Sequence, residues 1–189
     1  MRRGLERLLI VVAAFAISIG VIALLSGGLL AGRDNPGVNA GQSGPGTRYR
    51  DQGNLHLRRG ELRPVYDSDP PTSGPHIPQA VLRDGAELSN DQLLQALEVG
   101  DVVFMYGTPQ PPRGLEAIAQ AVAGSFTPAL AASGQAVILA RRPGTRGVIA
   151  LAWTHMLHTL SGPDLRGFAQ FWLSRGATTI STSRTSGGG

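Results

Sequence analysis

Histidines are the residues of this chain best suited to chemistry. There are four, His56, His76, His155 and His158, and an imidazole can bind a metal ion or carry a proton near neutral pH. His155 and His158 lie three positions apart with Met156 between them, and imidazole with thioether would suit copper. A pair without a third ligand indicates a metal site only weakly. We therefore expect these two histidines to close the edge of a strand and face solvent.

His76 belongs to a segment with little conformational freedom. Four prolines and a glycine lie between Pro70 and Pro78, and this composition permits only an extended or turning loop. Such a loop is stiff enough to aim a side chain, and loops often carry functional residues. The residues alone support equally a functional histidine and one that only hydrogen-bonds within a structural turn.

Hydrolytic catalysis has little support in the sequence. Ser73 lacks the Gly-x-Ser-x-Gly turn of hydrolases, and His76 is too near along the chain to act as an ordinary triad base. Glu98 and Asp101 form a carboxylate pair, but both flank the end of a predicted helix, where we expect them to cap the helix or remain solvated. We predict that the protein is not an enzyme.

Composition excludes several classes of function. The chain has no cysteine, and all 17 basic residues are arginine, so thiol nucleophiles, disulfides and Schiff-base lysines are absent. Much of the net charge of +4 comes from the first 33 residues, because from Asp34 onward 13 arginines face 12 acidic residues. Without a basic patch, no nucleic-acid partner is expected.

An uncharged apolar run over residues 8–30 predicts a transmembrane helix, because it is long enough to cross a hydrocarbon core of about 30 Å. Three arginines and one glutamate precede it, which predicts a cytoplasmic N-terminus. A cleaved signal peptide is the alternative, but this run is longer than the usual hydrophobic region and no small-x-small site is evident at its end. We expect a single-pass protein of the cytoplasmic (inner) membrane with its C-terminal part outside.

The remaining chain divides by composition. We expect residues 1–30 to form the cytoplasmic N-terminus and transmembrane helix. The segment 31–53 is rich in Gly, Asn, Pro and Ser, which predicts a flexible linker. We expect residues 177–189 to form a disordered tail. Residues 54–176 are long enough for one extracytoplasmic domain with its own core.

Hydrophobic periodicity predicts an α+β fold for this domain. A capping box at Ser89 and a glycine at position 100 bound one helix, and residues 102–106 form a buried strand. Further helices are expected over 111–124 and 163–176, and strands over 135–140 and 148–153 are expected to form an antiparallel hairpin. The order predicts a small mixed sheet packed by helices, with a parallel first crossover.

These residues carry a resemblance to a known family. Tyr66, the string Pro-Pro-Thr-Ser-Gly-Pro-His over residues 70–76, and the segments 96–98 and 100–103 resemble DUF3105, a bacterial family of uncharacterised, often membrane-anchored extracytoplasmic domains. The resemblance covers roughly residues 55–175. The second family motif reads approximately His-Ala-Leu-Glu-His-Gly, whereas Gln95 and Val99 stand here at its two histidine positions.

If the family has a metal site, the resemblance implies that this member keeps His56, His76 and Glu98 as candidate ligands and lacks two imidazoles. We expect such a degenerate site to bind copper or zinc no more tightly than about micromolar, because tight structural zinc has four protein ligands.

The sequence favours a non-catalytic accessory or structural subunit of a larger membrane protein complex, with integral membrane subunits as partners and no cofactor. Small residues at Gly20, Ser26, Gly27 and Gly28 would let another transmembrane helix approach closely. An extracytoplasmic domain with a degenerate copper or zinc site is the alternative, and a hydrolase ranks third.

Overall fold

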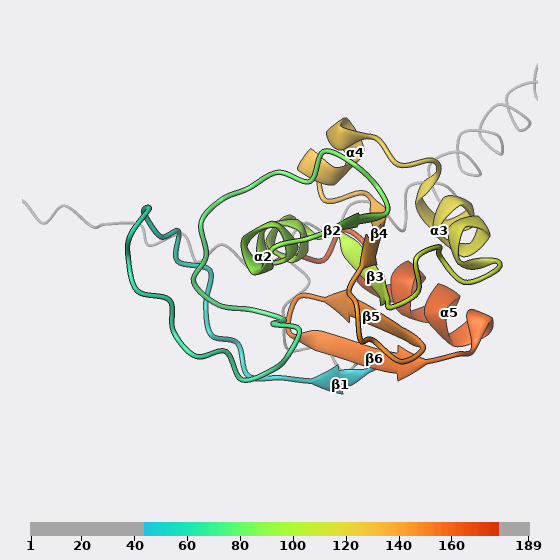
Figure 1. The fold of residues 1–189 in the computed structure, drawn as a ribbon, viewed down its shortest axis with the longest axis horizontal. Helices are drawn as coiled ribbons and strands as arrows, with labels where there is room; N and C mark the ends of the chain where they lie inside the picture. The colour runs from blue at the N-terminus through green and yellow to red at the C-terminus, as the bar shows by residue number, and fades with distance from the viewer. Residues whose placement is uncertain (1–43, 178–189) are drawn as a thin grey trace, which may run out of the picture. The chain divides into compact units, whose positions relative to one another are not determined.

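The computed structural model describes residues 44–177 of the chain (Figure 1). The predicted transmembrane helix over residues 8–30, the predicted linker as far as residue 43 and residues 178–189 of the predicted tail lie outside the described residues. Within residues 44–177, none of the helices combines the length and apolar character needed to cross a membrane.

A mixed sheet of six strands organises the described domain. The strands are β1 (Thr47–Arg48), β2 (Ala86–Glu87), β3 (Val102–Tyr106), β4 (Val137–Arg141), β5 (Val148–Ala152) and β6 (His155–Thr159). Their order across the sheet is β1-β6-β5-β3-β4-β2. β3 and β4 are parallel, as we predicted for the first crossover, and β3 pairs with β5 in the antiparallel direction.

Helices pack on both faces of this sheet. They are α2 (Asn90–Val99), α3 (Leu115–Ala123), α4 (Pro128–Ala132) and α5 (Gly162–Trp172). Alternate residues of β3 point to opposite faces, so Val103 and Met105 belong to the cluster that includes α2, whereas Phe104 and Tyr106 pack with α3 and α5. With both faces covered, the central strands are continuous apolar runs. The predicted α+β class is confirmed.

Local signals in the sequence set the bounds of α2. The Ser89 hydroxyl accepts a hydrogen bond from the Gln92 backbone N–H, and the Gln92 side chain accepts one from the Ser89 N–H. Gly100 ends the helix in the left-handed conformation, and its N–H bonds back to the carbonyl of Leu97. Both predicted ends of this helix are confirmed.

The predicted hairpin between residues 135–140 and 148–153 is wrong. β4 and β5 exist, but β3 lies between them in the sheet, because a strand with two buried faces also needs a partner for its backbone on each edge. The tight hairpin joins β5 to β6 instead. Ala152 pairs with His155, so Trp153 and Thr154 alone form the turn, and Thr154 takes a positive φ of 61°.

The end of the predicted linker is folded. Thr47 and Arg48 form β1 and pair with His155 and Met156 on the sheet edge. The Trp172 indole N–H donates to the carbonyl of Pro45 at 2.9 Å. Residues 47–49 are thus held on the sheet edge by main-chain pairing, which composition does not reveal. This part of the segment predicted as a linker is ordered on the domain.

A matched pair of glycine substitutions tests the packing between the α4 segment and the end of α2. Gly134 (φ +68°) and Gly124 (φ +78°, ψ −174°) both have a positive φ, but a Cβ at Gly134 would lie 1.9 Å from the Val99 carbonyl oxygen, and one at Gly124 would meet nothing within 4 Å. We predict that Gly124→Ala lowers the free energy of unfolding by about 1–3 kcal/mol, and Gly134→Ala by at least about 2 kcal/mol more. Denaturant unfolding of both variants measures this, and equal losses would contradict the close approach.

Candidate metal site

Three side chains from distant parts of the sequence converge at one place. His56 Nε2 lies 3.0 Å from Glu98 Oε2, and His76 Nε2 lies 3.1 Å from the same oxygen. The three potential ligand atoms all lie within 4.8 Å of one another. The two imidazole rings meet edge to face, with centroids 5.4 Å apart. The three residues predicted as candidate ligands therefore form one cluster.

The proline-rich loop aims His76 by main-chain pairing. The His76 N–H donates to the carbonyl of Leu55 at 3.1 Å, and the Leu57 N–H donates to the carbonyl of His76 at 2.8 Å. These bonds make a short parallel bridge between His56 and His76, which brings the two rings to the same side. The Tyr66 hydroxyl donates to the Pro75 carbonyl and fixes the loop just before the histidine.

Glu98 reaches the cluster from the last turn of α2. Its side chain is 14% exposed, and its Oε1 accepts a hydrogen bond from the Asn54 side-chain amide at 2.9 Å. This bond orients the carboxylate so that Oε2 faces both imidazoles. Asn54 therefore acts as a support for the candidate ligand Glu98.

The protonation of His76 gives the cluster its electrostatic character. His76 Nδ1 lies 3.0 Å from the carbonyl oxygen of Gly74, and since a carbonyl can only accept, Nδ1 must carry a proton. In the neutral ring, Nε2 then has a lone pair. This buried atom makes no hydrogen bond of suitable geometry, although the Glu98 carboxylate is 3.1 Å away. A lone pair facing an anion is repulsive unless a cation or a second proton lies between them.

The arrangement fits a small transition-metal ion. Zinc binds imidazole nitrogen and carboxylate oxygen at about 2.0–2.2 Å, so neighbouring ligand atoms of a tetrahedral site lie about 3.3–3.6 Å apart, and a small outward shift of the side chains would open that space. The distances of 3.0 and 3.1 Å are just below this range. Metal-binding histidines usually donate their other ring N–H to a carbonyl or carboxylate, as His76 does to Gly74. The side chain of His56 is 51% exposed, so solvent reaches the cluster from its side.

The other two histidines do not form a site together. Residues three apart on a strand point to opposite faces, and β6 separates His155 from His158 in this way. His155 is 1% exposed and stacks on Trp172 with ring centroids 3.9 Å apart, and burial lowers its pKa. The expectation that both histidines face solvent is wrong for His155, because α5 covers that face of the sheet edge.

Ser73 has a structural role. It is fully buried, its hydroxyl donates to the carbonyl of Arg50, and it accepts from the N–H of Gln52. These bonds hold the segment that follows β1 against the proline-rich loop.

Asp101 was expected to cap a helix end or remain solvated, and this is wrong. It is 1% exposed, and its Oδ1 accepts a hydrogen bond from the Ala136 N–H at 2.8 Å. Burial raises the pKa of this carboxyl from 3.8 to about 8, against the opposing effect of that hydrogen bond. Sequence reasoning missed this residue because its hydrogen-bond partner Ala136 lies 35 residues further along the chain, where no local pattern reveals it.

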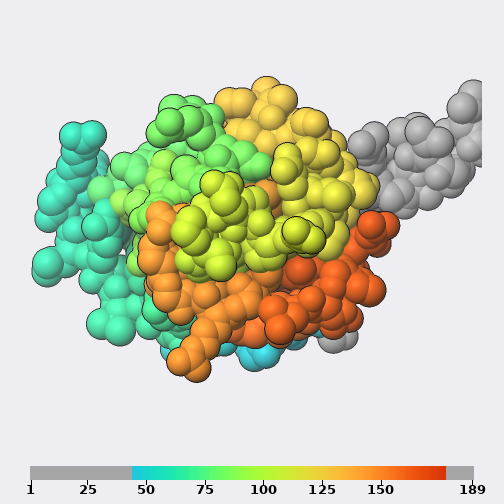
Figure 2. Space-filling model, turned by 45° about the vertical axis from the view of Figure 1, so that its right-hand side comes forward, coloured from blue at the N-terminus to red at the C-terminus, as the bar shows by residue number. Residues whose placement is uncertain are grey.

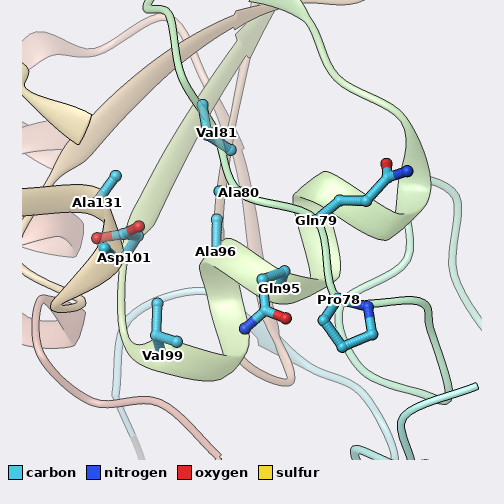
Figure 3. Close-up of a pocket in the computed structure, with 10 residues that line it drawn as sticks. Pro78, Gln79, Ala80, Val81, Gln95, Ala96, Val99, Asp101 and Ala131 are labelled. Atoms are coloured by element: carbon cyan, nitrogen blue, oxygen red, sulfur yellow. The ribbon is translucent and has the colours of Figure 1, made fainter. Parts of the chain in front are cut away.

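Gln95 and Val99 line a pocket of about 280 Å³ together with Asp101 (Figure 3). His56, His76 and Glu98 do not line this pocket. The two positions at which the resemblance implied missing imidazoles therefore face a different hollow from the three-residue cluster. This removes the reason for expecting the cluster to be weakened by those two substitutions.

The chain belongs to the DUF3105 family, described as a protein of unknown function, whose model matches residues 61–179. The match covers more than half of the chain and includes His76 and Glu98, while His56 lies five residues before it. No curated protein and no solved structure matches the chain significantly.

Asp101 predicts a specific dependence of stability on pH. In the folded state the carboxyl keeps its proton up to about pH 8, whereas in the unfolded chain it loses the proton near pH 4. The folded state binds more protons between these values, so this contribution to stability is complete below pH 4 and is lost as the pH rises to 8. We predict that Asp101→Asn removes a decline on the order of 5 kcal/mol, since the pKa difference of about four units is worth about 1.4 kcal/mol per unit. Urea unfolding at several pH values measures it, and parallel curves for the two proteins would contradict the assignment.

Proposed function

We propose that this protein is a metal-binding domain that holds one zinc or copper ion through His56, His76 and Glu98. One observation carries the proposal: the buried Nε2 of His76 has no hydrogen-bond partner and faces a carboxylate oxygen at 3.1 Å. A metal ion bound by both atoms would replace this contact with two favourable bonds.

The donor set supports zinc or copper over other ions. Imidazole nitrogen suits zinc and copper(II), whereas calcium and magnesium prefer oxygen ligands. Two histidines and one glutamate leave one position of a tetrahedral ion for water or another ligand. With His56 half exposed, an ion at this site could exchange with solvent or a partner. We therefore propose metal handling, on the outer side of the cytoplasmic membrane if the predicted topology holds.

Metal titration of the full-length chain tests the site. We predict that metal-stripped protein binds one equivalent of Zn²⁺ in isothermal titration calorimetry, and that His76→Ala and Glu98→Gln each lower the affinity by about 100-fold or more. Asn54→Ala should lower it by roughly 10–100-fold, because it removes the support of a ligand. His158→Ala is the matched control, since this histidine lies on β6 outside the cluster.

Two results would overturn this proposal. One is the absence of stoichiometric binding to a protein whose circular dichroism shows it to be folded. The other is equal affinity in His76→Ala and His158→Ala, which would place any bound ion elsewhere.

A second candidate function is that of an accessory subunit in a membrane complex. The segment around His56 exposes large apolar side chains, with Leu62 at 96%, Val65 at 92% and Leu55 at 66%. Figure 2 shows this part of the chain, in blue-green, projecting from the rest of the domain. Apolar side chains gathered at such a projection favour contact with another protein.

We predict that Leu62→Ser with Val65→Ser depletes membrane subunits that co-purify with the protein in mild detergent, by removing apolar contact area. Leu160→Ser is the matched control, because Leu160 is 85% exposed but lies after β6. Quantitative mass spectrometry measures the co-purifying subunits. Undiminished recovery with the double variant would exclude this surface as the interface.

A further inference from the structure

A hollow whose lining does not include the histidine cluster lies beside α2. Its volume is about 280 Å³, close to the lower end of small-ligand pockets. It lies between α2, α4 and the segment 78–81, and in Figure 3 Asp101 is at the end near Ala131, with Pro78 and Gln79 at the opposite end. Most of the lining is apolar, from Pro78, Ala80, Val81, Ala96, Val99, Ala131 and Ala132.

Two buried oxygens of the pocket lining lack partners. Asp101 Oδ2 makes no hydrogen bond, although the other oxygen of this carboxyl is held by the Ala136 N–H. Gln95 Oε1 also makes none. Buried polar atoms in native proteins are nearly always paired, and an unpaired one calls for a ligand, an ion or water. Asp101 is only 1% exposed, so its unpaired oxygen can be reached only by a molecule within the pocket.

The charge of the lining restricts the ligand. Asp101 is the one charged or titratable side chain among the residues that line the pocket, and Glu98, three residues earlier, faces the histidine cluster. No arginine in the lining could neutralise a carboxylate or phosphate, and the ionised form of Asp101 would repel such an anion. An ammonium group would instead form a charge-assisted hydrogen bond, about twice as strong as a neutral one.

We propose that this pocket binds a small primary amine, with the ammonium group at Asp101 Oδ2 and a short apolar body against Val81, Val99 and Ala131. The amine supplies three N–H donors, one for Asp101 Oδ2 and the others for water molecules in the pocket. This binding is separate from the proposed metal site, because His56, His76 and Glu98 do not line the pocket.

The binding depends on pH in a way that identifies Asp101. An ammonium ion needs the ionised carboxylate, which is about 9% of the population at pH 7 and about 91% at pH 9 when the pKa is about 8. An alkyl amine with a pKa above 10 keeps its charge over this range. The affinity should therefore rise about tenfold from pH 7 to pH 9.

The probe is cyclohexylamine, with cyclohexanol as its neutral match, titrated into ¹⁵N-labelled full-length protein. We expect amide shifts at Ala96, Val99 and Ala136, saturation in the millimolar range for so small a ligand, and an approximately tenfold gain between pH 7 and pH 9 for the amine only. Asp101→Asn keeps the side-chain volume and should abolish both the amine preference and the pH dependence.

Ala132→Leu provides a second variant that leaves Asp101 in place and fills part of the pocket, and it should weaken both probes. Equal binding of amine and alcohol to the wild-type protein, an unchanged amine affinity in Asp101→Asn, or no binding to a folded protein would each overturn the proposal. His76→Ala should leave amine binding unaltered, so failure here is distinguishable from failure of the metal site.

Discussion

The whole fold depends on β3, which needs side-chain packing on both faces of the sheet and a backbone partner on both of its edges. Its side chains are buried on both faces of the sheet, and its backbone pairs with β4 on one edge and β5 on the other. α2 enters this strand through Gly100 and Asp101 alone, with Gly100 in a left-handed conformation. Since β3 is fixed on every side, the last turn of α2 is fixed as well. Both candidate sites take their key carboxylate from residues 98–101, which form the junction between the last turn of α2 and β3.

The two carboxylates of the junction face different surroundings. Glu98 points toward the proline-rich loop, where Asn54 and two imidazoles meet it. Asp101 points toward α4, where it accepts a hydrogen bond from the Ala136 N–H and is otherwise surrounded by apolar side chains. Burying a polar atom without a partner costs on the order of 1–3 kcal/mol. The junction leaves His76 Nε2 on one side and Asp101 Oδ2 on the other without a hydrogen bond, and a site that tolerates such a cost is a candidate for function.

Local signals made part of this fold predictable. The capping box at Ser89 and the glycine at position 100 determine α2 from within the helix itself, and the apolar run over 102–106 determines a buried strand. The β5–β6 hairpin was not predictable in this way, because its turn is Trp153-Thr154 and contains none of the glycine or asparagine that usually supplies a positive φ. The position of β3 between β4 and β5 arises from pairing between distant strands, which no local pattern encodes.

The candidate metal site was likewise predictable in its residues but not in its geometry. His56, His76 and Glu98 were identifiable from residue type and family resemblance, but their convergence depends on a parallel bridge between segments twenty residues apart and on the end of α2. The resemblance also led to an expectation of a weak site, because Gln95 and Val99 stand at the two histidine positions of the family motif. Geometry separates them: these two side chains line the Asp101 pocket, and Glu98 faces the histidines. Substitution at 95 and 99 therefore alters the volume and polarity of the pocket while leaving the three-residue cluster complete, so the two sites can vary independently on one helix.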